Sequence, residues 1–184
     1  LCERVLEWLT AHPDRRRLAD IGTGSGALAV SLAHCVPDLR VTAVDCSDAA
    51  LAVAARNAQT HGVADRVAFR RGDVLTPVSE TDAIVSNPPY ITSAVVETLA
   101  PEVKDFDPRL ALDGGPDGLA PYRVIAALAQ AFLVPGGQVL VEIGYDQGSS
   151  VSALFAEHGF ADIVVHKDLN GLDRVISGHH LKDK

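Results

Sequence analysis

A short apolar run followed by closely spaced glycines constrains the fold of this chain most strongly. Residues 18–21 predict a buried strand, and the glycines begin at the next position. A helical pattern then runs from about residue 27 to residue 36 and ends at Pro37. Strand, glycine turn and helix form the first half of a βαβ unit, so the sequence predicts an α/β fold. The turn can approach a ligand closely, and five of its residues are candidate cofactor contacts: Gly22, Thr23, Gly24, Ser25 and Gly26.

Acidic residues follow the next two predicted strands. Residues 40–44 predict the second strand, and Asp45 comes directly after it. A carboxylate at this place can accept hydrogen bonds from both hydroxyls of a ribose. Residues 67–69 predict the third strand, which leads to Asp73 and Val74. We expect Asp73 to accept a hydrogen bond from an adenine amino group, and Val74 to pack against the adenine ring.

A fourth predicted strand, residues 82–85, is followed by the sequence Ser-Asn-Pro-Pro-Tyr. Neither Pro88 nor Pro89 has an N–H to donate, so the chain must leave the sheet at Asn87, where open α/β sheets bind ligands. The Asn87 amide oxygen and the Pro88 carbonyl can accept two hydrogen bonds, and Tyr90 offers a flat ring. These four residues predict a clamp for a planar –NH2 group. The alternative is an ordinary polar turn with a packed tyrosine.

The second half of the chain completes the predicted sheet. Residues 119–133 predict a helix, and residues 138–143 predict a fifth strand. The dipeptide at 170–171, Asn-Gly, predicts a hairpin between two short strands, residues 163–166 and 174–177. We therefore predict a Rossmann-like, seven-stranded, mostly parallel sheet with an antiparallel hairpin at its carboxyl end. Residues 178–184 are predicted to be a frayed tail.

Two cofactors fit the glycine turn. The spacing of Gly22, Gly24 and Ala27 suits a nicotinamide dinucleotide, and the G-x-G-x-G spacing of residues 22–26 suits S-adenosylmethionine equally well. Three features favour S-adenosylmethionine. Asp73 adds an acidic position suited to an adenine, and the fourth strand ends in a clamp for an amine instead of a hydride-transfer site. The terminal hairpin gives a sheet that resembles the class I S-adenosylmethionine-dependent methyltransferase fold.

The chain resembles the peptide chain release factor glutamine methyltransferases over nearly its whole length. Besides the clamp, the resemblance rests on four segments: residues 19–27, 102–123, 141–144 and 168–174. Asn-Pro-Pro-Tyr itself is shared with enzymes that methylate amino groups of adenine or guanine in DNA and RNA, which leaves such an activity as the alternative. The family carries a helical domain in front of its catalytic domain and a Pro-Arg-Pro segment before the first helix, and neither has a counterpart in this sequence.

The resemblance implies a reaction and a set of roles. A methyl group would pass from S-adenosylmethionine to the side-chain amide nitrogen of a glutamine in the Gly-Gly-Gln loop of a release factor. Catalysis and substrate binding would fall to the clamp, residues 87–90: Asn87, Pro88, Pro89 and Tyr90. Asn87 would also contact the cofactor, together with the glycine turn and the acidic positions. Residues 1–184 would form the catalytic domain, and residues 91–118 an insertion that recognises the substrate.

Composition narrows the possible partners and location. The formal net charge is −8, and no basic block exceeds three arginines, which argues against a nonspecific nucleic-acid binder. Three cysteines (Cys2, Cys35 and Cys46) lack metal-ligand spacing and indicate reduced thiols, so we expect a cytoplasmic protein without a bound metal. The sequence contains no apolar run of membrane-spanning length, so no membrane partner is expected. It begins at Leu1 and contains no methionine, which suggests part of a longer protein, and we expect a monomer.

Overall fold

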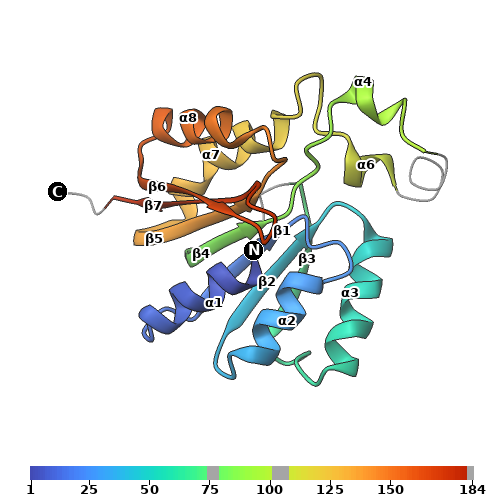
Figure 1. The fold of residues 1–184 in the computed structure, drawn as a ribbon. Helices are drawn as coiled ribbons and strands as arrows, with labels where there is room; N and C mark the ends of the chain where they lie inside the picture. The colour runs from blue at the N-terminus through green and yellow to red at the C-terminus, as the bar shows by residue number, and fades with distance from the viewer. Residues whose placement is uncertain (74–78, 101–107, 182–184) are drawn as a thin grey trace.

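Seven strands form one sheet in the computed structural model, which describes residues 1–73, 79–100 and 108–181 (Figure 1). The strands are β1 Arg17–Ile21, β2 Arg40–Asp45, β3 Val67–Arg71, β4 Thr81–Ser86, β5 Leu133–Glu142, β6 Phe160–Lys167 and β7 Asp173–His180. They lie in the order β3-β2-β1-β4-β5-β7-β6. β1 to β5 are parallel, and β7 is antiparallel to both neighbours. The predicted sheet with its terminal hairpin is confirmed.

Helices cover both faces of this sheet. The described helices are α1 Cys2–Ala11, α2 Ala27–Cys35, α3 Asp48–Thr60, α4 Ser93–Val96, α6 Arg109–Leu112, α7 Ala120–Phe132 and α8 Gly148–Glu157. Figure 1 shows α1, α2 and α3 on one side of the sheet and α7 and α8 on the other. None of the helices in the described ranges is both long and apolar enough to cross a membrane.

Alternating side chains on the strands fill two apolar cores, one on each face of the sheet. On β4, Ile84 packs into the core beneath α7 and α8, whereas Ala83 and Val85 pack into the core beneath α1 and α2. On β5, Val141 and Leu140 divide between the same two cores. Successive side chains of a strand point to opposite faces, so continuous apolar runs are expected in strands that are covered on both sides.

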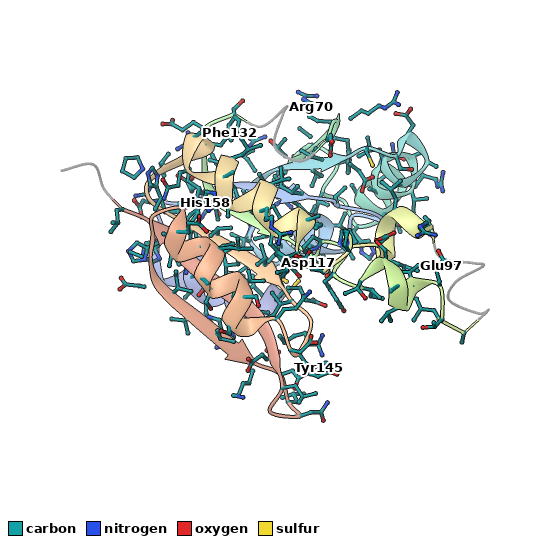
Figure 2. All side chains as sticks on the ribbon, turned by 90° about the horizontal axis from the view of Figure 1, so that it is seen from above. Arg70, Glu97, Asp117, Phe132, Tyr145 and His158 are labelled. Atoms are coloured by element: carbon teal, nitrogen blue, oxygen red, sulfur yellow. The ribbon has the colours of Figure 1, made fainter. Side chains whose placement is uncertain are left out.

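The strand order places the predicted site residues at one edge of the sheet. β1 and β4 are parallel neighbours, with Ile21 opposite Ser86, so the chain leaves both strands side by side. β2 and β3 lie beyond β1 on one side, and β5 lies beyond β4 on the other. The chain thus adds strands on one side of β1 and then, from β4, on the other side. Open α/β sheets form a ligand crevice where the strand order reverses in this way. In Figure 2, Glu97 lies toward this edge, and Phe132 and His158 mark the helix ends at the opposite side.

The structure corrects two predicted boundaries. β5 begins at Leu133, directly after α7, and includes residues 134–137, which lie between the predicted helix and the predicted fifth strand. A register shift opposite Thr81 accommodates them. The predicted tail is wrong for residues 178–180, because β7 continues through His180 and pairs there with residues 138–139 of β5 and 160–161 of β6. The His180 ring also makes a hydrogen bond of 3.1 Å with the Leu133 carbonyl.

Candidate active site

The glycine turn after β1 is a tight bend with an open surface. Gly22, Gly24 and Gly26 have φ angles of +69°, +55° and +80°, a left-handed backbone region that favours glycine. A Cβ atom at Gly22 or Gly24 would meet nothing within 4 Å, whereas one at Gly26 would lie 2.9 Å from the Ala54 Cβ. Gly26 is therefore required for packing against α3. The first two glycines leave the backbone accessible to a ligand.

A buried carboxylate braces this turn from below. Asp20 has no exposed surface, and its Oδ2 accepts hydrogen bonds from the Thr23 hydroxyl at 2.6 Å and from the Ala29 N–H at 3.1 Å. Its Oδ1 has no hydrogen-bond partner among the described residues. Burial raises the pKa of Asp20 to about 6, although its two hydrogen bonds act in the opposite direction and lower it. The sequence prediction gave Asp20 no role, although an acid within an apolar strand next to the glycines is a usable signal.

Asp45, the predicted ribose acid, lies against the same turn. Its Oδ2 accepts a hydrogen bond of 2.8 Å from the Gly24 N–H, and its Oδ1 accepts one of 2.9 Å from the Ser47 N–H. These bonds fix the direction of the carboxylate. Each carboxylate oxygen has two acceptor positions, so the side chain can still receive hydroxyl groups of a ligand. Asn57 of α3 donates to the Ser25 carbonyl at 2.8 Å and ties the far side of the turn to the helix.

The predicted adenine contacts are only partly described. Asp73 is exposed and lies two residues beyond β3. The Gly72 N–H donates to the Asp45 carbonyl at 3.1 Å, which brings the chain after β3 beside the end of β2. Asp73 therefore lies near the carboxyl edge of the sheet, beside the end of β2. Val74, the other predicted contact, lies outside the described residues.

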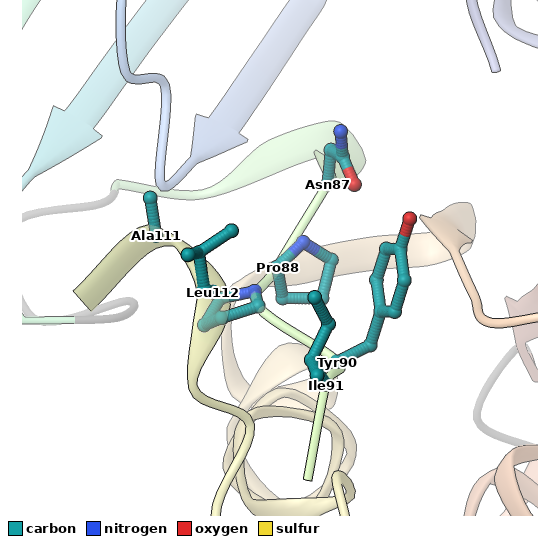
Figure 3. A pocket seen from close by; sticks show the side chains of 7 residues that line it. Asn87, Pro88, Tyr90, Ile91, Ala111 and Leu112 are labelled. Carbon is teal, nitrogen blue, oxygen red and sulfur yellow. The ribbon is translucent and has the colours of Figure 1, made fainter. Parts of the chain in front are cut away.

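The clamp begins where β4 leaves the sheet. The Ser86 hydroxyl donates to the Ile21 carbonyl at 2.7 Å and connects the root of the clamp to the root of the glycine turn. Asn87 is exposed and Pro88 is buried. A pocket of about 130 Å³ is lined by the clamp, by Ile91, and by Ala111 and Leu112 (Figure 3). In Figure 3, the Tyr90 hydroxyl lies at the same side of the pocket as the Asn87 side chain.

A segment far along the chain forms the opposite wall of the pocket. The Ile91 N–H donates to the Leu112 carbonyl at 3.1 Å, and the Gly114 N–H donates to the Ile91 carbonyl at 2.8 Å. Asp113 accepts from the Ser93 hydroxyl at 2.6 Å, and this hydrogen bond is the main cause that lowers the pKa of its carboxyl. Part of the predicted insertion thus folds back onto the clamp. Residues 101–107, including Phe106 and Asp107 of the family-like segment, lie outside the described residues.

The lining of the pocket suits positioning more than proton transfer. Of the described residues around it, Tyr90 alone has a titratable side chain. Within residues 1–73, 79–100 and 108–181, no cluster of histidine, cysteine and acidic side chains is arranged to hold a metal ion. The arrangement offers hydrogen-bond acceptors and an aromatic face beside an accessible glycine turn. Such a site can hold a planar amine against a ligand bound to the turn.

Comparison with known proteins agrees with this arrangement. The protein "Release factor glutamine methyltransferase" of Geobacter sulfurreducens is 45% identical over 176 residues, which cover 95% of this chain and 61% of that protein. The protein of the same name from Moorella thermoacetica is 49% identical over 175 residues, 94% of this chain and 61% of that protein. The chain therefore spans less than two thirds of the length of these relatives. The resemblance drawn from the sequence is confirmed.

Solved structures share the fold at low sequence identity. A methyltransferase from Pyrococcus furiosus matches with a TM-score of 0.69 and 16% identity, covering 97% of this chain and 82% of that one. An RNA methyltransferase from Salinibacter ruber, in complex with S-adenosyl-L-homocysteine, matches with a TM-score of 0.62 and 20% identity. The match covers 100% of this chain and 92% of that one. The family model described as "Methyltransferase small domain" matches residues 3–103, more than half of the chain. The glycine turn, the clamp and these matches agree, and the chain belongs to the methyltransferase small domain family.

Proposed function

We propose that this chain transfers a methyl group from S-adenosylmethionine to the side-chain amide nitrogen of a glutamine in the Gly-Gly-Gln loop of peptide chain release factors. One observation carries the proposal: the pocket formed by Asn87, Pro88 and Tyr90 opens where β4 ends, beside the glycine turn that follows β1. The names of the relatives at 45% and 49% identity support the choice of substrate.

The residues at the carboxyl edge fit the proposed cofactor. The accessible backbone at Gly22 and Gly24 can lie against the amino-acid end of S-adenosylmethionine. Asp45 is oriented by two backbone N–H groups and retains acceptor positions for the ribose hydroxyls. The buried Asp20 Oδ1, without a partner among the described residues, adds an acceptor below the turn. When bound, S-adenosylmethionine supplies a methyl group on a sulfonium, which is already a strong electrophile.

The clamp would prepare the substrate nitrogen. An amide nitrogen is a poor nucleophile because its lone pair is delocalised into the carbonyl. The Asn87 side-chain oxygen and the Pro88 carbonyl accept hydrogen bonds from the two N–H groups of the substrate amide. These bonds orient the nitrogen and increase its electron density. Pro89 shapes the turn, and Tyr90 packs on the amide plane. Asn87 is exposed, so water can accept the proton that the methylated nitrogen loses.

Segment 91–118 would contribute to recognition of the substrate. Its described part supplies Ala111 and Leu112 to the wall that faces the clamp. This wall is apolar, so it can pack against the aliphatic part of a glutamine side chain while the clamp binds the amide. The short hydrogen-bonded bridge between Ile91 and Asp113 holds the wall at a fixed distance from the clamp.

Transfer of labelled methyl tests the proposal and separates it from its rival. The chain is incubated with labelled S-adenosylmethionine and a purified release factor, and with the same factor after replacement of the glutamine in its Gly-Gly-Gln loop. Transfer RNA and DNA are assayed in parallel, and cofactor binding is measured on the same sample by calorimetry. We expect label on the intact factor only. Label on RNA or DNA would assign the clamp to a nucleic-acid amino methyltransferase instead.

A further inference from the structure

A buried glutamine at the start of α8 connects the clamp to other segments of the site. Gln147 is 8% exposed, and its Nε2 donates to the carbonyls of Tyr90 and Gly118, both at 3.1 Å. Its Oε1 accepts a hydrogen bond of 2.9 Å from the Gly144 N–H and lies 3.4 Å from the Tyr122 hydroxyl oxygen. A glutamine amide has two N–H groups, and both are used here. One side chain thus joins the clamp, the end of segment 91–118, and the end of β5.

The two carbonyls that Gln147 binds belong to backbones in direct contact. A Cβ atom at Gly118 would lie 2.5 Å from the Tyr90 oxygen and 2.8 Å from the Gln147 Nε2. A Cβ atom at Gly114 would lie 2.8 Å from the Pro89 oxygen and 2.9 Å from the Tyr90 Cα. No side chain other than hydrogen fits between these backbones. The Gln147 amide therefore holds the clamp and the segment carrying the opposite wall as one unit.

We infer that Gln147 is a positioning residue for the clamp. Pro88 and Pro89 each have a restricted φ, so the peptide at Tyr90 decides how the clamp continues. The hydrogen bond from Gln147 fixes the direction of the Tyr90 carbonyl and, through it, the place of the ring in the pocket. Gln147 does not line the pocket, so it acts through Tyr90. The effect of Gln147 on the rate of methyl transfer rests on the proposed function, whereas its effect on the position of the clamp does not.

The substitution Gln147→Glu tests this role with little change in size. The glutamate keeps an oxygen that can accept from the Gly144 N–H, but its second oxygen replaces the donor that faces two carbonyls. An ionised glutamate then faces both carbonyls with no proton to donate, and a protonated one has a single O–H for the two, so the double bridge is lost in either form. The substitution Gln130→Glu is the matched control. Gln130 is half-buried near the carboxyl end of α7, beside Gly159 and toward the edge of the sheet away from the clamp.

Three measurements on the unsubstituted chain and both variants decide the inference. They are kcat for methyl transfer to a release factor, cofactor affinity by calorimetry, and hydrogen–deuterium exchange of the amides that join the clamp to segment 91–118. The reporting amides are those of Ile91 and Gly114, which bond to Leu112 and Ile91 respectively. We expect Gln147→Glu to lower kcat by about 100-fold, because small displacements of a positioned group cost that much. Cofactor affinity should be unchanged, exchange at both amides should accelerate, and Gln130→Glu should match the unsubstituted chain.

Unchanged kcat or unchanged exchange in Gln147→Glu would overturn the inference. If that variant unfolds at the assay temperature, Gln147→Met, which adds no charge, is measured in the same way and judged by the same two results. The exchange measurement needs no substrate. If the unsubstituted chain transfers no methyl to the factor, the proposed function fails, and exchange alone still decides whether Gln147 anchors the clamp.

Discussion

Replacing Asp20 by asparagine should remove a pH dependence of stability that originates beneath the glycine turn. Asp20 is completely buried, and burial raises the pKa of its carboxyl from the ordinary 3.8 to about 6. Between these values the folded chain holds a proton that the unfolded chain has released. Stability therefore falls as pH rises through this window and is level above it.

The size of the effect follows from the same two values. A pKa raised from 3.8 to about 6 corresponds to about 3 kcal/mol, because each tenfold change in proton affinity is worth about 1.4 kcal/mol. Asparagine does not titrate, yet its side-chain oxygen can still accept from the Thr23 hydroxyl and the Ala29 N–H. The free energy of unfolding of Asp20→Asn, relative to the unsubstituted chain, should rise by about 3 kcal/mol between about pH 3.5 and pH 7.

Urea unfolding of both proteins over this pH range measures the difference. Subtracting the two curves removes the titration of every other group, because those groups are shared. The asparagine places an NH2 group where Oδ1 was, which shifts the free energy of unfolding by a constant amount. This shift does not change how the difference between the two curves varies with pH. Curves that run parallel from about pH 4 to about pH 7 would refute the argument, since they would show that the Asp20 carboxyl titrates alike in the folded and unfolded chains.

Three further predictions concern the clamp, the cofactor site and the amino edge of the sheet. Asn87→Ala should lower methyl transfer by at least about 100-fold in a steady-state assay while calorimetric cofactor affinity is retained; near-normal turnover would remove the clamp from the mechanism. Asp45→Ala should weaken cofactor binding in calorimetry, and an unchanged affinity would exclude the ribose assignment. Burial raises the pKa of Asp82, but hydrogen bonds from Arg17 and the Arg16 N–H lower it below its usual value. Asp82 therefore stabilises the fold above its unfolded pKa, and this contribution is lost as pH falls. Asp82→Asn should lower the urea midpoint more at neutral than at acid pH, and an equal loss at both would contradict that sign.

The sheet and the ends of its strands could be predicted from local sequence. Ile84 and Val85 belong to an apolar run typical of a strand covered on both faces, and Pro88 and Pro89 mark its end. The place of Asp45 after an apolar strand is readable from the sequence, and the structure puts its carboxylate beside Gly24. These features depend on residues close together in the chain, which is why pattern and propensity predicted them.

The contacts that join distant segments could not be predicted in this way. Gln147 lies 57 positions from Tyr90, and nothing in its neighbourhood distinguishes it from a solvated glutamine before a helix. The local sequence does not show why positions 114 and 118 need glycine, whereas in the structure the clamp backbone passes too close to both for any side chain. The ordered end of β7 pairs with residues 138–139 of β5 and with residues 160–161 of β6, so its own sequence did not show that it is a strand.

The most direct test of the account is the chemical position of the transferred methyl group. After reaction of the chain with S-adenosylmethionine and a release factor, peptide fragmentation by mass spectrometry identifies the modified residue, and acid hydrolysis of that peptide tests for methylamine. We expect one methyl group on the glutamine of the Gly-Gly-Gln loop and release of methylamine, which would show that the amide nitrogen carries it. A methyl group on any other residue or on a carboxylate oxygen, or none where the cofactor binds, would contradict the account.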